Sequence, residues 1–203
     1  MPETTRTFLA VAVPDALVTR LERLQRQLGE ELPGTRWVAT KPFHVTLAFL
    51  GDVDNADLHA LCRATAEAAE GVGRFELRLE GLGVFPDVRR PRVIWTGLTG
   101  PGVETLRDLQ ATLAETTARQ RYPTDGKPFH PHVTLGRFKP GRSEDPARTR
   151  ALNHMIGHYK TWHAGPFAVT EAVVFASSQT DDGAAYVPLG RAPLRGRKPG
   201  AAP

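Results

Sequence analysis

Two stretches of the sequence decide the fold. Residues 41–47 read KPFHVTL, and residues 127–135 read KPFHPHVTL. Both stretches begin with Lys-Pro-Phe and end with His-Val-Thr-Leu, and the second has one extra His-Pro between these two parts. A single His-x-Thr pattern recurs by accident, but the whole chain contains 7 histidines, and two copies that share so many letters indicate a duplicated unit.

Each copy is predicted to be a β-strand, because Val, Thr, Leu and Phe favour strands and a proline just before the histidine suits a strand start. On a strand, residues two apart point to the same face and lie roughly 6–7 Å apart. His44 therefore lies beside Thr46, and His132 lies beside Thr134, whereas the valine and leucine of each motif point into a core. Two such strands facing each other across a pseudo-two-fold axis would line one cleft with two imidazoles and two hydroxyls.

This set of side chains suits acid–base chemistry on a phosphate. A neutral imidazole takes a proton from water, an imidazolium protonates a leaving oxygen, and threonine hydroxyls donate hydrogen bonds to phosphate oxygens. Histidine titrates near neutrality, so one base and one acid can coexist in the same cleft at pH 7. The plainer alternative is a pair of ordinary strands with half-buried histidines.

The composition is that of a globular protein, with 203 residues, of which 40% are hydrophobic and 24% charged. This length predicts one large domain or two small, closely packed lobes. We expect neither a signal peptide nor a membrane span, because no apolar stretch is long enough. The single cysteine, Cys62, cannot form an internal disulfide. This favours a reducing, cytoplasmic location and a role for Cys62 as a small buried hydrophobe.

The net charge of +4 is concentrated at the C-terminus, where residues 191–203 contain four basic residues and no acid. Removing these four from the 26 basic residues leaves 22, which balance the 22 acidic ones. The segment is also rich in Pro and Gly, so we expect one domain over residues 1–190, followed by a disordered basic tail. A second basic stretch, residues 121–142, indicates either contacts with a nucleic acid or a solvated loop.

The rest of the chain alternates strand-like and helix-like patterns. An apolar run at residues 5–13 predicts a buried strand, and Leu17, Leu21, Leu24 and Leu28 predict the inner face of a helix. Further helices are predicted at about 54–70, 103–113 and 146–159, and further strands at 36–38, 44–50, 75–80, 93–98, 131–138, 167–177 and 184–189. Hairpin-like spacings point to antiparallel pairing and so to an α+β, two-lobed domain.

On these residues the sequence resembles the 2H phosphoesterases, specifically the RNA 2′,3′-cyclic phosphodiesterases that are also called 2′-5′ RNA ligases. The superfamily is named after two His-x-Thr-x motifs, which are His44–Leu47 and His132–Leu135 in this chain. The likeness covers residues 6–194 in matching order and spacing. Its other parts are Arg6–Val11, Arg36–Val38, Phe49–Gly51, Gly81–Pro86, Arg90–Trp95, Phe129–His132, Arg137, Phe175–Ser177 and Tyr186–Leu189.

The resemblance implies a bilobal, duplicated domain with two antiparallel sheets flanked by helices and a central cleft to which each lobe contributes one motif. It also implies metal-independent hydrolysis of a 2′,3′-cyclic phosphate to a 2′-phosphomonoester, without a cofactor. The expected substrates are RNA ends or cyclic nucleotides, and the expected active form is a monomer. His44 and His132 would be the acid–base pair, and Thr46 and Thr134 would hold the phosphate. Our hypothesis is that His132 activates the water and His44 protonates the leaving 3′ oxygen.

Two further residues are candidates for substrate binding. Arg137 and His130 could add positive charge at the phosphate site. Strict alternation along the strand, however, places Arg137 on the same face as Val133 and Leu135, away from the histidine. Arg137 would reach the cleft only if the strand twists or ends there.

Three alternatives remain open at this point. A metal hydrolase could use His44, His130 and His132, and His154 and His158 have the helical spacing of a metal-binding pair. No carboxylate or cysteine lies at the usual ligand spacing, and threonine is a poor zinc ligand, so we expect no metal site. A non-catalytic RNA-binding module would have no need of two titratable groups. The third alternative is 2′-5′ ligation or cleavage, or action on a small cyclic nucleotide.

Overall fold

The structure is a computed structural model that describes residues 3–39, 42–124, 126–139, 145–180 and 183–196. Four helices and nine strands form the described part of the chain. In chain order they are β1 (Thr4–Ala12), α1 (Asp15–Glu31), β2 (Arg36–Trp37), β3 (His44–Asp54), α2 (Leu58–Glu70), β4 (Phe75–Phe85), β5 (Val93–Thr99), α3 (Val103–Arg119), β6 (His132–Arg137), α4 (Pro146–His158), β7 (His163–Val169), β8 (Glu171–Thr180) and β9 (Gly183–Pro193).

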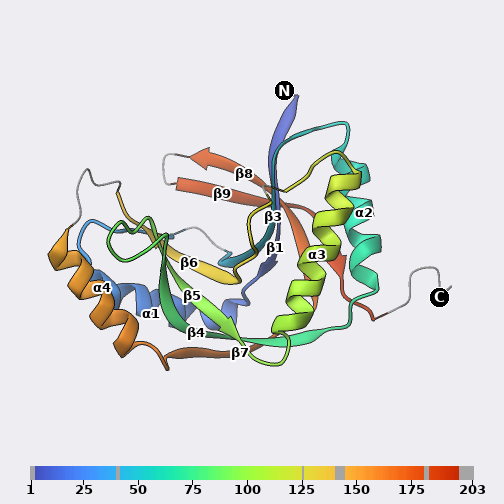
Figure 1. The fold of residues 1–203 in the computed structure, drawn as a ribbon. Coiled ribbons are helices and arrows are strands. Elements are labelled where there is room, and N and C mark those ends of the chain that lie inside the picture. The colour runs from blue at the N-terminus through green and yellow to red at the C-terminus, as the bar shows by residue number, and fades with distance from the viewer. Residues whose placement is uncertain (1–2, 40–41, 125, 140–144, 181–182, 197–203) are drawn as a thin grey trace.

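The strands form one curled, antiparallel sheet in the order β7-β4-β5-β6-β3-β1-β8-β9, with β2 paired to β6 (Figure 1). The two motif strands, β6 and β3, lie at its centre. We call the four strands from β6 to β7 the β6 half and the four strands from β3 to β9 the β3 half. The α+β, antiparallel prediction is confirmed. The prediction of two separate sheets is wrong, because the pairing of Val45 with Val133 joins the halves into one.

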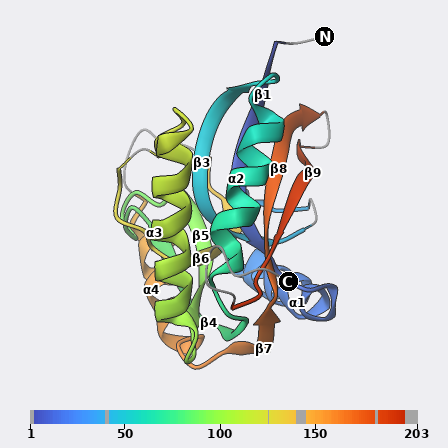
Figure 2. The same ribbon diagram turned by 90° about the vertical axis from the view of Figure 1, so that its right-hand side faces the viewer.

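Two helices, α1 and α3, each pack against the half of the sheet that does not contain the strand they follow. Helix α1 follows β1, yet it packs against β6 and β7, and α4 packs against β4. Helix α3 follows β5, yet it packs against β3 and lies beside α2, which covers β8 and β9 (Figure 2). Each half therefore needs a helix that the sequence places after a strand of the other half.

Helix α1 shows how the sequence produces this packing. Leu21, Leu24 and Leu28 recur at helical spacing and are fully buried, as the apolar periodicity predicts. Asp15 lies in the first turn, where a carboxylate interacts favourably with the helix dipole. The same buried cluster includes residues from every helix and from both halves of the sheet, so one continuous core supports the central strands.

Two predicted elements differ from the structure. Residues 167–177 were expected to form one strand, but the chain crosses the sheet at Thr170, so β7 pairs with β4 and β8 pairs with β1. The residues on either side of Thr170 are strand-like, and no Gly or Pro marks the crossing. Helix α2 begins at Leu58 rather than near residue 54, because β3 continues to Asp54, which pairs with Thr4 of β1.

The boundary predicted at residue 190 is also wrong. Strand β9 continues to Pro193, and both Ala192 and Leu194 are buried in the core. Arg191 pairs with Glu171, and Arg195 lies 3.4 Å from Glu70. The first residues of the predicted tail therefore belong to the domain, and residues 197–203 lie outside the described part.

No helix within the described residues is long and apolar enough to cross a membrane. Cys62 is partly buried in α2, and burial raises the pKa of its thiol. Its sulfur lies against Gly190, where an added Cβ would come within 2.8 Å of it. This contact agrees with the predicted role of Cys62 as a small packing residue.

Candidate active site

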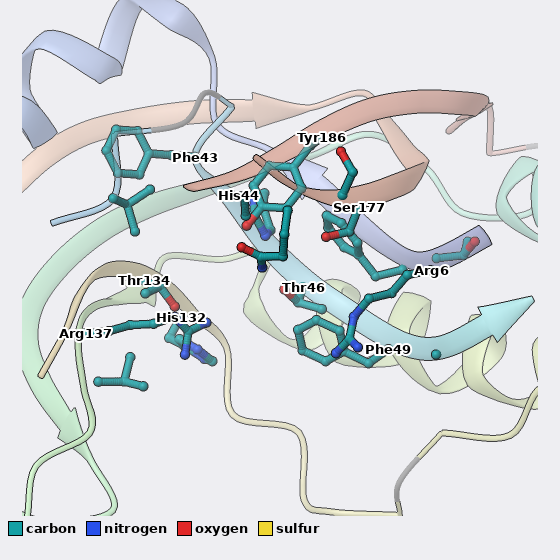
Figure 3. Close-up of a pocket in the computed structure, with 18 of the residues that line it drawn as sticks. Arg6, Phe43, His44, Thr46, Phe49, His132, Thr134, Arg137, Ser177 and Tyr186 are labelled. Atoms are coloured by element: carbon teal, nitrogen blue, oxygen red, sulfur yellow. The ribbon is translucent and has the colours of Figure 1, made fainter. Parts of the chain in front are cut away.

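The two His-x-Thr strands meet at a residue pair in the middle of both motifs, Val45 of β3 and Val133 of β6. Because the strands are antiparallel, this register places His44 across from Thr134 and Thr46 across from His132. Both valines are fully buried in the core. The four polar side chains point to the opposite face, where they line one pocket of about 920 Å³ (Figure 3).

Each histidine is held in the same way by the backbone just before it. The Nδ1 atom of His44 lies 3.0 Å from the carbonyl oxygen of Pro42, and the Nδ1 atom of His132 lies 2.7 Å from that of His130. A carbonyl oxygen only accepts hydrogen bonds, so Nδ1 carries the hydrogen in both rings. The Nε2 atom of each ring is left to accept a proton when the ring is neutral, or to donate one when the ring is charged.

Aromatic side chains surround both imidazoles. The His44 ring lies 5.0 Å from the rings of Phe8 and Tyr186, and the His132 ring lies 5.0 Å from that of Phe85. Burial among these groups lowers the pKa of both histidines below the usual value, because it disfavours the charged form. The hydrogen bonds to the backbone carbonyls oppose this effect, and the nearby positive charge of Arg137 adds to it.

A β-bulge turns Arg137 into the pocket. Ile94 and Trp95 are adjacent in β5, but their partners in β6 are Gly136 and Thr134, so Leu135 is an extra residue. The carbonyl oxygen of Leu135 accepts hydrogen bonds from Gln25 Nε2 at 2.8 Å and from the backbone of residue 38 at 2.9 Å. The alternation shifts by one residue there, and Arg137 lines the pocket with Thr134.

Strand β3 has a bulge at the matching position. Leu9 and Ala10 are adjacent in β1, but they pair with Ala48 and Thr46, so Leu47 is the extra residue. Its carbonyl oxygen accepts a hydrogen bond from Gln110 Nε2 of α3 at 3.3 Å. Leu47 and Ala48 are both buried, and the next residue, Phe49, turns onto the pocket face.

A family model described as the 2′-5′ RNA ligase superfamily matches residues 13–181. The chain belongs to the 2′-5′ RNA ligase superfamily. The family resemblance read from the sequence is therefore confirmed.

Relatives in this superfamily match along most of the chain. An RNA 2′,3′-cyclic phosphodiesterase of Aquifex aeolicus is 31% identical over 182 residues, which are 89% of this chain and 93% of the relative. One of Methanothermobacter thermautotrophicus is 30% identical and covers 91% of this chain and 96% of the relative.

Solved structures agree with the fold. TT0787 of Thermus thermophilus superposes with a TM-score of 0.74 at 26% identity, and the match covers 95% of this chain and 100% of the TT0787 chain. E. coli LigT complexed with 3′-AMP superposes with a TM-score of 0.72 at 29% identity, and the match covers 95% of this chain and 99% of the LigT chain.

Six residues were predicted from the sequence to form the site. The pocket brings together five of them, namely His44, Thr46, His132, Thr134 and Arg137. His130 is the exception. Its side chain is exposed, and its ring packs against the rings of Phe85 and Trp95 at 5.2 and 5.1 Å instead of lining the pocket. The observed contact of His130 with the site is its backbone carbonyl oxygen, which holds Nδ1 of His132, and a role of its side chain at the phosphate stays a prediction.

Other pocket residues had no role assigned from the sequence. They include Arg6 of β1, Phe49 of β3, Lys127 of the loop before β6, and Ser177 and Tyr186 of the β8–β9 hairpin. The available signals were the family resemblance and the basic stretch at residues 121–142, which contains Lys127. The stretches that carry the resemblance contain the other four of these residues, Arg6, Phe49, Ser177 and Tyr186. Their position at the pocket depends on which strands neighbour β3, and a single sequence does not contain that information.

His154 and His158, which were considered as a metal-binding pair, do not line the pocket that holds His44 and His132. His154 and His158 are exposed on α4, with ring centroids 6.1 Å apart. Among the described residues, no group of three or more His, Cys, Asp or Glu side chains could hold a metal ion.

Proposed function

We propose that this protein is an RNA 2′,3′-cyclic phosphodiesterase that hydrolyses 2′,3′-cyclic phosphate ends to 2′-phosphomonoesters. The observation that carries the proposal is the matched pair of histidines, each with Nδ1 fixed to a backbone carbonyl and with Nε2 left for chemistry, in one pocket. Superfamily membership and relatives named RNA 2′,3′-cyclic phosphodiesterase support the choice of substrate.

In this mechanism His132 and His44 act from opposite sides of the phosphorus. Neutral His132 takes a proton from water at Nε2 as the water oxygen bonds to phosphorus. The bond from phosphorus to the 3′ oxygen breaks, and protonated His44 gives its Nε2 proton to that oxygen. The products are a 2′-phosphate and a 3′-hydroxyl, and exchange of one proton of each ring with solvent restores the starting state.

Thr46, Thr134 and Arg137 bind the phosphate oxygens in this account. Each threonine is placed across from the histidine of the other motif, so a phosphate between the imidazoles lies between two hydroxyl donors. The Arg137 guanidinium faces the pocket and can donate two parallel hydrogen bonds to one phosphate. Such fixed donors stabilise the additional negative charge on the oxygens in the transition state.

The same residues can catalyse 2′-5′ ligation, the reaction after which the superfamily is named. A 5′-hydroxyl takes the place of water, loses its proton to one imidazole and forms a 2′-5′ diester as the 3′ oxygen leaves. Hydrolysis is favoured where water is the abundant nucleophile, so we place ligation second.

We further propose that the two sheet halves arose by duplication and form one domain that acts as a cytoplasmic monomer. The matching bulges at Leu47 and Leu135, each with its carbonyl bonded by a helix glutamine, support the duplication. Every residue that the mechanism uses comes from one chain, so the site requires no second copy, and the lone Cys62 supports a reducing compartment.

The test is hydrolysis of 2′,3′-cyclic AMP in the presence of EDTA, with 2′-AMP and 3′-AMP separated by chromatography. The proposal predicts undiminished turnover in chelator and 2′-AMP as the product. Turnover that is lost in EDTA and restored by zinc or manganese would support the metal alternative instead. A 3′-AMP product would contradict the assignment of the bond that breaks.

A further inference from the structure

Arg36 of β2 lies directly across from Arg137 of β6 in the sheet. Directly paired residues of neighbouring antiparallel strands point to the same face, with their Cβ atoms about 4.5–5.5 Å apart. On its other side Arg137 pairs with Val93 of β5, which lines the pocket. The register therefore places the Arg36 side chain on the pocket face of the sheet, beside that of Arg137.

The residues that follow Arg36 agree with this direction. Trp37 points to the opposite face, because an added Cβ at Gly136 would lie 2.9 Å from its ring and one at Gly29 of α1 would lie 3.2 Å from its indole nitrogen. Val38 points back and lines the pocket. Side chains alternate along an extended segment, so Arg36 shares the face of Val38.

The two guanidinium groups are like charges that no carboxylate of the described residues neutralises. Both side chains are exposed, and neither forms an ion pair or a side-chain hydrogen bond with another described residue. Like charges directly opposite each other on neighbouring strands destabilise the sheet. An anion bound between the two groups removes this repulsion, so the pair is arranged to bind negative charge.

The anion that fits beside Arg137 is a second phosphate. Arg137 lines the pocket and binds the cyclic phosphate in the proposed function, whereas Arg36 lies outside the set of lining residues, at the rim. In an RNA end, the phosphate next to the reacting one is the diester on the 5′ oxygen of the same nucleoside. Arginine is suited to such a contact, because its planar guanidinium donates two parallel hydrogen bonds to phosphate oxygens.

We propose that Arg36 binds the phosphodiester that joins the terminal nucleotide to the rest of the RNA. The strand then leaves the pocket over β2, on the side of Arg137. This inference rests on the proposed function for its substrate, and it makes an RNA end, rather than a mononucleotide, the preferred substrate of the site.

The test compares 2′,3′-cyclic AMP with the dinucleotide ApA that ends in a 2′,3′-cyclic phosphate. The wild type should have the higher kcat/KM on the dinucleotide. For Arg36→Ala this value should fall roughly 2- to 10-fold, between the effects of an exposed ion pair and of a hydrogen bond to a charged group. Its kcat/KM on cyclic AMP should stay at the wild-type value, and Arg36→Lys should retain part of the preference for the dinucleotide.

Arg23→Ala is the matched control, because Arg23 is an exposed arginine of α1 that does not line the pocket. It should leave kcat/KM on both substrates unchanged. Equal losses on both substrates in Arg36→Ala would assign Arg36 to the reacting phosphate and overturn the proposal.

A second measurement separates this inference from the proposed function. Calorimetry compares 2′-AMP with adenosine 2′,5′-bisphosphate, which differs from it only by a phosphate on the 5′ oxygen. Arg36→Ala should weaken binding of the bisphosphate by a factor similar to that seen in kcat/KM and leave binding of 2′-AMP unchanged. The advantage of the bisphosphate in the wild type should also shrink as salt rises, because counterions compete for the phosphate.

Unchanged binding of the bisphosphate in Arg36→Ala would overturn the phosphate contact. A loss confined to the dinucleotide would place Arg36 against the neighbouring nucleoside and overturn it as well. A protein that hydrolyses neither substrate would contradict the proposed function, and the binding comparison would still decide the role of Arg36.

Discussion

Val45 and Val133 pair across the centre of the sheet, and this contact lies between the histidine and the threonine of both motifs. The pair is fully buried, so the core below it fixes the relative position of the four polar side chains above it. Strand β2 pairs with the next part of β6, at Gly136 and Arg137, and separates β6 from β3 there. The two motif strands touch at this pair and diverge beyond it, which leaves room for a ligand.

The first prediction concerns Gln25, whose buried amide donates to the carbonyls of both Leu135 and Val38. Gln25→Ala removes one donor from each of these oxygens, although that of Leu135 keeps the backbone N–H of Val38, and should lower the free energy of unfolding by about 1–3 kcal/mol. The Leu135 bulge directs Arg137 into the pocket, so kcat/KM on a cyclic nucleotide should fall as well. Chemical denaturation and steady-state kinetics measure the two effects.

Gln27→Ala is the matched control for Gln25, because Gln27 is exposed on the same helix. It should change neither quantity. If Gln25→Ala kept full activity despite its lower stability, the bulge would not be what positions Arg137.

A second prediction concerns the support of His132. An added Cβ at Gly83 would lie 2.2 Å from the ring of Trp95, whose centroid is 6.0 Å from that of His132. Gly83→Ala should therefore displace Trp95 and destabilise the protein by about 1–3 kcal/mol. Gly157→Ala, in the open space of α4, should instead stabilise it by about 0.5–1 kcal/mol. Thermal melting of both variants makes the comparison, and equal shifts would show that the contact with Trp95 is irrelevant.

The pH dependence follows from the lowered pKa of both histidines. The base must be neutral, so activity rises with pH through its pKa, and the acid must be protonated, so activity falls with pH through its pKa. Burial lowers both values below 6.5, so both limbs of the kcat/KM profile, which reports the free enzyme, should lie on the acidic side of pH 6.5. A kcat/KM profile with both limbs above that value would contradict the role of burial.

The C-terminal segment gives a further prediction. A protein that ends at Gly196 should melt at the same temperature as the full chain. A protein that ends at Gly190 loses the buried side chains of Ala192 and Leu194, and burial of one leucine alone is worth about 1.5–3 kcal/mol. It should therefore melt at a clearly lower temperature, and equal melting of the two truncated proteins would show that the end of β9 is dispensable.

Much of this architecture could be predicted from local patterns. The leucine periodicity of α1 and the β-branched motifs specify their elements directly, and the repeated His-x-Thr predicts a shared cleft because alternation puts both polar side chains on one face. The direction of Arg137 could not be predicted by alternation. It depends on the Leu135 bulge, and that bulge is held by Gln25, 110 residues away in sequence.

The crossing at Thr170 and the exchange of helices between halves were missed for a similar reason. Both depend on which half of the sheet each segment packs against, and the local sequence is compatible with either half. The pocket positions of Phe49, Arg6 and Tyr186 likewise follow from strand order and a bulge. Local propensity identifies elements, whereas contacts distant in sequence place them.

The most direct test of the two-histidine mechanism is the pH profile of kcat/KM on 2′,3′-cyclic AMP, measured in EDTA for the wild type, His44→Ala and His132→Ala. Circular dichroism should show that both variants are folded, and His154→Ala, an exposed histidine on α4, is the control. Each pocket variant should lose roughly 10²–10⁴-fold in activity and one limb of the bell. Loss of the acidic limb in His132→Ala and of the alkaline limb in His44→Ala would identify the base and the acid as assigned. Full activity with an unchanged bell in either variant would contradict the mechanism.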